Sequence, residues 1–235
     1  MKLALHVPCF INELFPNVAK TTLLILREYK LHVTVPKNQT CCGQPFINSG
    51  VDTTLGKMYE EIFRGFDYII SPSSSCVSTI KSQNLSISDK TYELCSFLRD
   101  VLNLKDILKN HPPLILHNSC HSIRHLQLAT PSELNIPYKN KIKELLGCEI
   151  IEANRDECCG FGGVFSLKEG EMSYILGLSK LNDLLSNWKY DFTPTITGVD
   201  MSCLMHLKAI AQKENIKAEF KHISEVIWEY MDETL

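Results

Sequence analysis

The sequence lacks long hydrophobic runs and a strong excess of either charge. No stretch approaches the about 18 consecutive apolar residues that a membrane helix requires. The apolar run at the N-terminus is too short for a signal peptide, so we expect a cytoplasmic protein. A net charge of -3 gives no electrostatic reason to expect a nucleic acid or an anionic membrane as the partner.

Several signatures of common enzyme classes are also missing. The chain has no P-loop, no Gly-x-Gly-x-x-Gly after an expected strand, no His-Glu-x-x-His and no Gly-x-Ser-x-Gly. The sequence therefore gives no support for nucleotide hydrolysis, dinucleotide binding, zinc-protease chemistry or serine-hydrolase chemistry.

Cysteine, in contrast, is abundant, with ten residues. A chain of 235 residues can build a hydrophobic core without disulfides, and the cytoplasm keeps thiols reduced. Metal binding or redox chemistry therefore explains the cysteines better than a disulfide framework does.

Eight of these cysteines form two sets with the same order: a single cysteine, a Cys-Cys-Gly triplet, and another single cysteine. The first set is Cys9, Cys41, Cys42 and Cys76, and the second is Cys120, Cys158, Cys159 and Cys203. An internal repeat of this kind predicts two Cys-Cys-Gly domains of about 115 residues each. We place them at residues 1–111 and 112–235, because paired prolines follow residue 111.

Both units alternate short apolar runs with amphipathic helical patterns. In the first unit we expect strands at 2–7, 31–35 and 68–70, and helices at 14–29, 53–66 and 91–103. In the second we expect strands at 114–117, 148–153 and 195–199, and helices at 138–146, 172–185 and 223–231. This order predicts an α/β fold of two pseudo-repeated Rossmann-like domains, each with a mainly parallel sheet flanked by helices.

Every cysteine of both sets follows an expected strand. Ligands of open parallel sheets bind beyond the carboxyl ends of the strands, so three loops can bring four thiols together in each unit. Four ionised thiolates need a cation, which an iron–sulfur cluster or zinc supplies. The alternative is that these cysteines are simply buried apolar residues. This alternative is stronger for Cys9 and Cys76 than for Cys158 and Cys159, which stand in a glycine-rich loop.

Glycines and histidines are expected to surround the ligands. Glycine tolerates positive φ and lets backbone N–H groups approach cluster sulfides. His121 follows Cys120 and is a candidate ligand, proton carrier or hydrogen-bond donor, although a capping role is equally compatible. The residues expected around the ligands are Gly43, His121, Gly160, Gly162, Gly163 and His206.

Four further residues are assigned to the core. Cys95 and Cys148 fall outside both sets and have apolar neighbours. His6 and His117 occupy matching strand ends, where we expect them to form hydrogen bonds across the core.

Three segments of the second unit, residues 117–124, 157–166 and 198–206, carry a resemblance to a known family. On motifs such as Glu157-Cys158-Cys159-Gly160-Phe161-Gly162-Gly163, the chain resembles the cysteine-rich Cys-Cys-Gly-domain proteins. These include heterodisulfide reductase B subunits, glycolate oxidase iron–sulfur subunits and, with the greatest likeness, the lactate utilisation A (LutA) group. The resemblance implies a cytoplasmic iron–sulfur protein that works with LutB-like and LutC-like subunits to oxidise L-lactate to pyruvate.

The chain departs from the heterodisulfide reductase pattern, in which each motif ends in Cys-x-x-Cys. Here the fourth positions are Thr79 and His206, so each unit lacks a fifth cysteine. His206 could replace it in the second unit if a helix starts at Cys203, whereas Thr79 is a poor substitute. One or two clusters of the [4Fe–4S] type are therefore expected, with zinc as an alternative in one unit.

These observations predict an oxidoreductase subunit that transfers electrons and is not active alone. The alternatives are a thiol–disulfide oxidoreductase resembling heterodisulfide reductase and a zinc-binding structural subunit. No residue pattern in the chain identifies the lactate-binding or catalytic residues.

Overall fold

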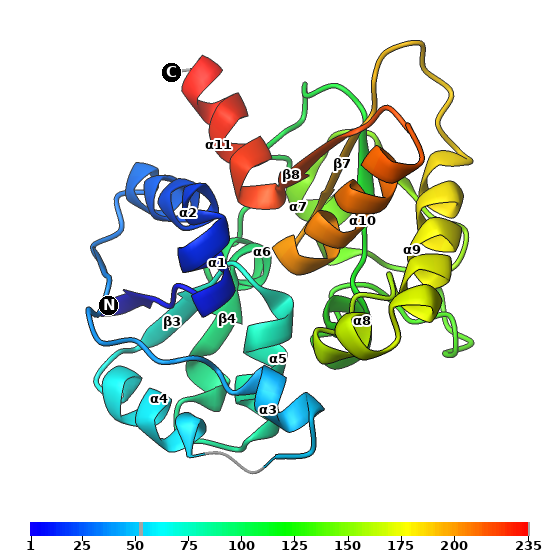
Figure 1. Ribbon diagram of the computed structural model, residues 1–235. Coiled ribbons are helices and arrows are strands. Elements are labelled where there is room, and N and C mark those ends of the chain that lie inside the picture. The colour runs from blue at the N-terminus through cyan, green and yellow to red at the C-terminus, as the bar shows by residue number, and fades with distance from the viewer. Residues whose placement is uncertain (52–53, 235) are drawn as a thin grey trace.

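The computed structural model describes residues 1–51 and 54–234, which form two parallel β-sheets flanked by helices (Figure 1). The strand order is β2-β1-β3-β4 in the first sheet and β6-β5-β7-β8 in the second, and every neighbouring pair is parallel. The two orders are equivalent, which confirms the predicted α/β class with two Rossmann-like halves.

In the first half the strands are β1 (Leu3–Leu5), β2 (Val33–Thr34), β3 (Tyr68–Ser71) and β4 (Thr91–Glu93). The helices are α1 (Cys9–Leu14), α2 (Pro16–Glu28), α3 (Gln44–Asn48), α4 (Leu55–Phe63), α5 (Ser74–Ser82), η1 (Ser88–Lys90), α6 (Leu94–Ser96) and η2 (Phe97–Val101).

In the second half the strands are β5 (Leu114–His117), β6 (Ile150–Glu152), β7 (Thr195–Gly198) and β8 (Glu219–His222). The helices are η3 (His121–His125), α7 (Lys141–Leu146), α8 (Val164–Lys168), α9 (Gly170–Leu185), α10 (Met201–Lys213) and α11 (Ile223–Thr234).

The central strands are mainly apolar, because helices cover both faces of each sheet and bury their side chains. All residues of β1 and β5 are buried, as the near-continuous hydrophobic runs of parallel strands predict. Helix α2 begins at Pro16, whose fixed φ suits the first helical turn, and it buries one apolar face that includes Val18 and Ile25.

The two halves share a core. Helix α11 of the second half packs beside α2 of the first, as Figure 1 shows, and the hydroxyls of Thr21 and Ser224 are 2.9 Å apart across this contact. One hydrophobic cluster includes Leu26 and Leu98 of the first half together with Leu114 and Val226 of the second. The proposed boundary between residues 111 and 112 therefore separates two sheets that pack on common apolar side chains.

Two local predictions are corrected by the structure. The expected helix at 91–103 begins with a strand, because Thr91–Glu93 completes the first sheet beside β3. The expected loop around Cys76 becomes helical at Ser74, and the Ser73 hydroxyl caps α5 by accepting a hydrogen bond from the Cys76 N–H. In both places the tertiary pairing or the cap decides the structure, and the apolar pattern alone does not reveal it.

Candidate metal centre at the carboxyl ends of the strands

The eight cysteines of the two sets line a single cavity of about 230 Å³ between the two halves. Cys9 follows β1, Cys76 follows β3, Cys120 follows β5, and Cys203 follows β7. The sequence predicted one site in each unit. The structure joins the two sites in one cavity, because the carboxyl ends of both sheets meet there.

In the first half the four thiols include two pairs whose sulfur atoms are in contact. The Sγ atoms of Cys9 and Cys41 are 3.6 Å apart, and those of Cys42 and Cys76 are 3.3 Å apart. All ten cysteines of the chain are free thiols. Two thiolates bound to one tetrahedral zinc ion, with Zn–S bonds of about 2.3 Å, would lie about 3.8 Å apart. The observed separations are close to that value.

One thiol in each half is strongly acidic. Hydrogen bonds from Cys42 and Cys9 lower the pKa of Cys41 to about 2, and hydrogen bonds from Cys120 and Cys159 lower the pKa of Cys158 to about 2. The pKa values of the four donor thiols, Cys9, Cys42, Cys120 and Cys159, are raised, chiefly because each donates a hydrogen bond to the neighbouring thiolate and therefore holds its own proton more tightly. Each half therefore holds one thiolate within a cluster of thiols, which is the start of a metal-binding set.

The glycine of each triplet adds a hydrogen bond to the thiolate. The Gly43 N–H donates to Cys41 Sγ, and the Gly160 N–H donates to Cys158 Sγ, both at 3.4 Å. Gly160 has φ +84°, and a Cβ there would lie 2.6 Å from the backbone oxygen of Ser173 on α9. Only glycine fits this position, because both the backbone conformation and the close approach of α9 exclude a side chain.

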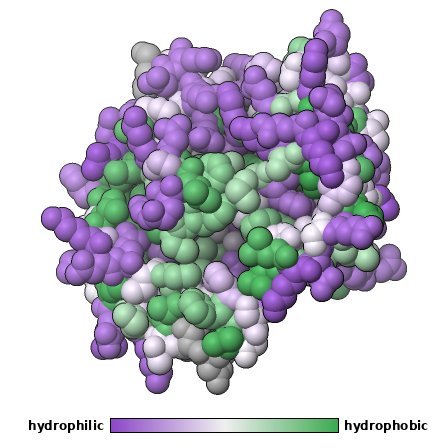
Figure 2. Space-filling model, in the orientation of Figure 1, coloured by the Kyte–Doolittle hydropathy of each residue, from purple (hydrophilic) through white to green (hydrophobic). Residues whose placement is uncertain are grey.

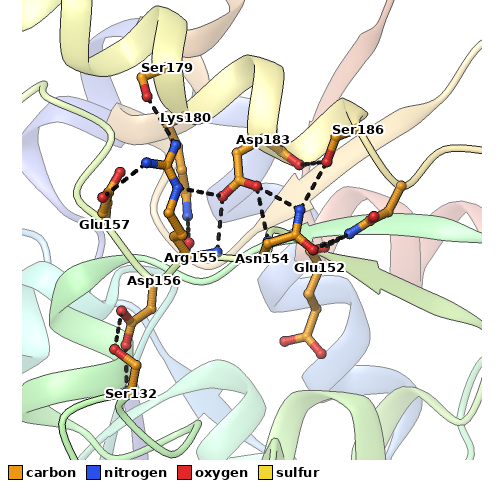
Figure 3. A network of polar contacts seen from close by, with 11 residues as sticks. Ser132, Glu152, Asn154, Arg155, Asp156, Glu157, Ser179, Lys180, Asp183 and Ser186 are labelled. Atoms are coloured by element: carbon orange, nitrogen blue, oxygen red, sulfur yellow. Dashed lines mark hydrogen bonds and ion pairs between the residues drawn. The ribbon is translucent and has the colours of Figure 1, made fainter.

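Helix α9 fixes the loop that leads to the second cysteine pair (Figure 3). The Asp183 carboxylate accepts hydrogen bonds from Asn154 N at 3.1 Å, Asn154 Nδ2 at 2.9 Å and Arg155 N at 3.0 Å. The buried Lys180 ammonium donates to the Arg155 carbonyl. Helix α9 thus holds the loop on both sides of Cys158 and Cys159, through Asp183 and Lys180 before them and through Ser173, whose hydroxyl donates to the Gly160 carbonyl, after them.

The two histidines expected beside the ligands have different surroundings. His121 lies next to the thiols, with Nδ1 3.7 Å from Cys120 Sγ, and its Nε2 is 3.2 Å from Gln44 Nε2 of the first half. His206 contacts α9 instead: its Nε2 is 3.2 Å from the Ser173 carbonyl oxygen, and its ring packs near Phe161.

The two strand-end histidines also differ from each other. His6 Nδ1 is 3.1 Å from the Ser71 hydroxyl, and the ring packs edge-on against Tyr59. His117 is 1% exposed, and within the described residues neither ring nitrogen has a hydrogen-bond partner. One ring nitrogen lies within 4.8 Å of the Sγ atoms of Cys159 and Cys203. Burial lowers the pKa of His117 to about 3, so its imidazole is neutral and has a free lone pair.

Asp200 joins the two halves at the base of the cavity. Although it stands at the N-cap position of α10, its carboxylate does not cap that helix. It accepts hydrogen bonds from Ser75 N at 3.0 Å, Ser73 Oγ at 3.1 Å and Ser119 Oγ at 2.6 Å, and from the Ser74 hydroxyl. Sequence analysis missed this residue, because nothing in the local pattern shows that its partners come from the first half.

Glu93 lies at the end of β4, and its ionisation is expected to make the stability of the fold depend on pH. Its side chain is buried, and burial raises its pKa from 4.5 to about 7, with a further contribution from the charge of Asp200. The folded state favours the neutral acid, so ionisation destabilises the fold as pH rises through 7. We expect Glu93→Gln to gain free energy of unfolding relative to the unmodified protein as pH rises from 4.5 to 7, by up to about 3 kcal/mol.

Denaturant unfolding between about pH 5 and 8 measures this difference. Glu171→Gln, at an exposed position on α9, is the control. A difference between Glu93→Gln and the unmodified protein that stays constant over this range would contradict the assignment.

The donor set fits a metal ion or an iron–sulfur centre. Thiolate is the ligand that zinc and iron–sulfur clusters share, backbone N–H groups point at the sulfur atoms, and His117 offers an unpartnered imidazole. The cavity lining is mainly apolar and includes Phe10, Phe161 and Met201. Figure 2 shows hydrophobic residues at the centre of this face, and the exposed apolar side chains include Phe46 on α3 and Leu167 on α8, the latter 86% exposed. Within the described ranges no helix has the length and apolar character of a membrane span.

The chain matches the family model of the cysteine-rich domain, named CCG, over residues 3–81 and 114–208. It is 30% identical to lactate utilization protein A 1 of Bacillus mycoides (strain KBAB4), covering 97% of this chain and 96% of the relative. It is 31% identical to lactate utilization protein A of Geobacillus sp. (strain WCH70), covering 97% and 99%, and 32% identical to that of Exiguobacterium sp. (strain ATCC BAA-1283 / AT1b), covering 95% and 96%. Each of the two matched segments contains its own complete set of four cysteines.

Proposed function

This chain belongs to the cysteine-rich CCG domain family, and on that premise we propose that it is the iron–sulfur electron-transfer subunit of an L-lactate-oxidising complex. Its role in lactate utilisation is supported by the relatives, which are named for it and match along nearly their whole length. The finer assignment, conversion of L-lactate to pyruvate in the cytoplasm together with LutB-like and LutC-like subunits, is part of the proposal.

The observation that carries the proposal is the convergence of eight free thiols on one cavity, with an acidic thiol in each half. An iron–sulfur cluster held there would accept and release single electrons. The Gly43 and Gly160 N–H groups already donate to sulfur, and such hydrogen bonds raise the reduction potential of a centre.

The surroundings of the cavity support electron transfer to a partner protein. The thiols lie near the surface: Cys9 and Cys158 are exposed, whereas Cys42 and Cys159 are buried. A partner that covers this mainly apolar cavity would exclude water and bring its own centre near these thiols.

The test is metal analysis of the full chain purified anaerobically. We expect iron and acid-labile sulfide at stoichiometric levels, and a paramagnetic signal that lactate generates only when the LutB-like and LutC-like subunits are added. Iron-free protein that supports full lactate oxidation in the assembled complex would overturn the proposal.

A zinc-binding structural subunit is the second candidate, and one observation favours it. Within each of two thiol pairs of the first half the sulfur atoms are 3.3 and 3.6 Å apart, close to the separation of two thiolates on one tetrahedral zinc ion. Stoichiometric zinc in both halves, with no redox-active absorbance after anaerobic handling, would establish this alternative.

A further inference from the structure

Among the described residues, three buried histidines have a ring nitrogen without a hydrogen-bond partner: His6 and His222 lack one at Nε2 only, whereas His117 lacks one at both nitrogens. His117 stands at the end of β5, and its ring is almost completely buried. A buried polar atom without a partner costs about 1–3 kcal/mol, and a bound ion or water is one of the common explanations for such an atom. Both ring nitrogens of His117 are in this position.

The equivalent residue of the first half explains why His117 is unpartnered. The strand registers align His6 with Ser71, because Leu5 pairs with Ile70, and they pair His117 directly with Gly198. His6 uses the Ser71 hydroxyl, at 3.1 Å. Gly198 has no hydroxyl to offer, and a Cβ there would lie 2.8 Å from the His117 carbonyl oxygen. The second half therefore replaces the partner of this histidine with a position that only glycine fits.

A metal ion bound to the neighbouring thiols could be the partner that His117 lacks. One ring nitrogen of His117 and the Sγ atoms of Cys159 and Cys203 all lie within 4.8 Å of one another, and the described residues contain no second group of this kind. His206, three residues after Cys203, does not take this place because its ring nitrogen contacts Ser173 on α9. An imidazole and two thiolates form a common partial ligand set for zinc, cobalt and iron.

We propose that His117 is a nitrogen ligand of the metal centre in the second half, together with the thiols of Cys159 and Cys203, whereas thiols alone hold the centre of the first half. This inference rests on the proposed function only in assuming that the second cysteine set binds a metal. An imidazole ligand carries no negative charge, so the centre of the second half is expected to have a higher reduction potential than an all-thiolate centre.

The test uses the full chain, freed of its native metal under anaerobic reducing conditions and loaded with Co²⁺ alone. Pulsed paramagnetic resonance should detect a nitrogen coupling that changes when the protein is labelled with ¹⁵N-histidine. His117→Phe should lose this coupling and bind the second equivalent of Co²⁺ at least about tenfold more weakly. His117→Cys should restore the affinity without the coupling.

His6→Phe is the matched control, because it removes the equivalent buried histidine of the first half and should keep the coupling. An unmodified protein without a histidine coupling would overturn the assignment. So would a coupling that persists in His117→Phe, since the ligand would then be another histidine such as His121. Iron measured in the anaerobically purified protein is a separate readout: its absence counts against the proposed function, while the cobalt coupling alone decides the role of His117.

Discussion

Replacing Asp200 by alanine is expected to lower the free energy of unfolding by about 3 kcal/mol. The carboxylate is 2% exposed and accepts hydrogen bonds from Ser73, Ser74 and Ser75 of the first half and from Ser119 of the second. Alanine leaves the Ser75 N–H at the start of α5 without its acceptor and removes the contact that joins the cavity walls. Denaturant unfolding, followed by circular dichroism, measures the change.

The matched control is Asp191→Ala, at an exposed position before β7, which should change the free energy of unfolding by less than about 0.5 kcal/mol. Asp200→Asn keeps one acceptor oxygen and should fall between the two. If Asp200→Ala proves as stable as Asp191→Ala, the hydrogen bonds that converge on Asp200 do not hold the two halves together.

Cys42→Ser and Cys159→Ser are each expected to lose about half of the metal bound per chain, and the double variant is expected to lose nearly all of it. Each substitution removes one buried thiol from a different half, and a hydroxyl is a poor ligand for zinc or iron. Metal and sulfide analysis of anaerobically purified protein, with the cluster absorbance, measures the loss.

Cys148→Ser provides the control for this series, because Cys148 lies outside both sets and packs beside the hydrophobic cluster. It should retain the full metal content. A double variant that keeps its metal would show that these thiols are not the ligands. Complete loss in either single variant would show that one centre spans both halves, in conflict with the two-centre proposal.

The strand-end position of the cysteines could be predicted because apolar strands and glycine-rich loops are local features of the sequence. The triplets at Cys41 and Cys158 stand in the expected loops, and Cys95 is buried in the core as expected. The short edge strand β4 was missed because Thr91–Glu93 precedes helical residues and becomes a strand only by pairing with β3. The hydrogen bond expected for His117 is absent among the described residues, and the sequence did not reveal this because its difference from His6 depends on Ser71 and Gly198 in neighbouring strands.

The sequence by itself determined the α/β class, the internal repeat and the two sets of thiols, because hydrophobic periodicity and residue spacing record them directly. Only the tertiary structure decided that both sets line one cavity, that Asp200 caps a helix of the other half, and that His117 is left without a partner. These features depend on how the carboxyl ends of two sheets face each other. Contacts between residues separated by 80 to 130 positions leave no periodic trace along the chain, as the separations of 81 and 127 residues between Asp200 and its partners Ser119 and Ser73 illustrate.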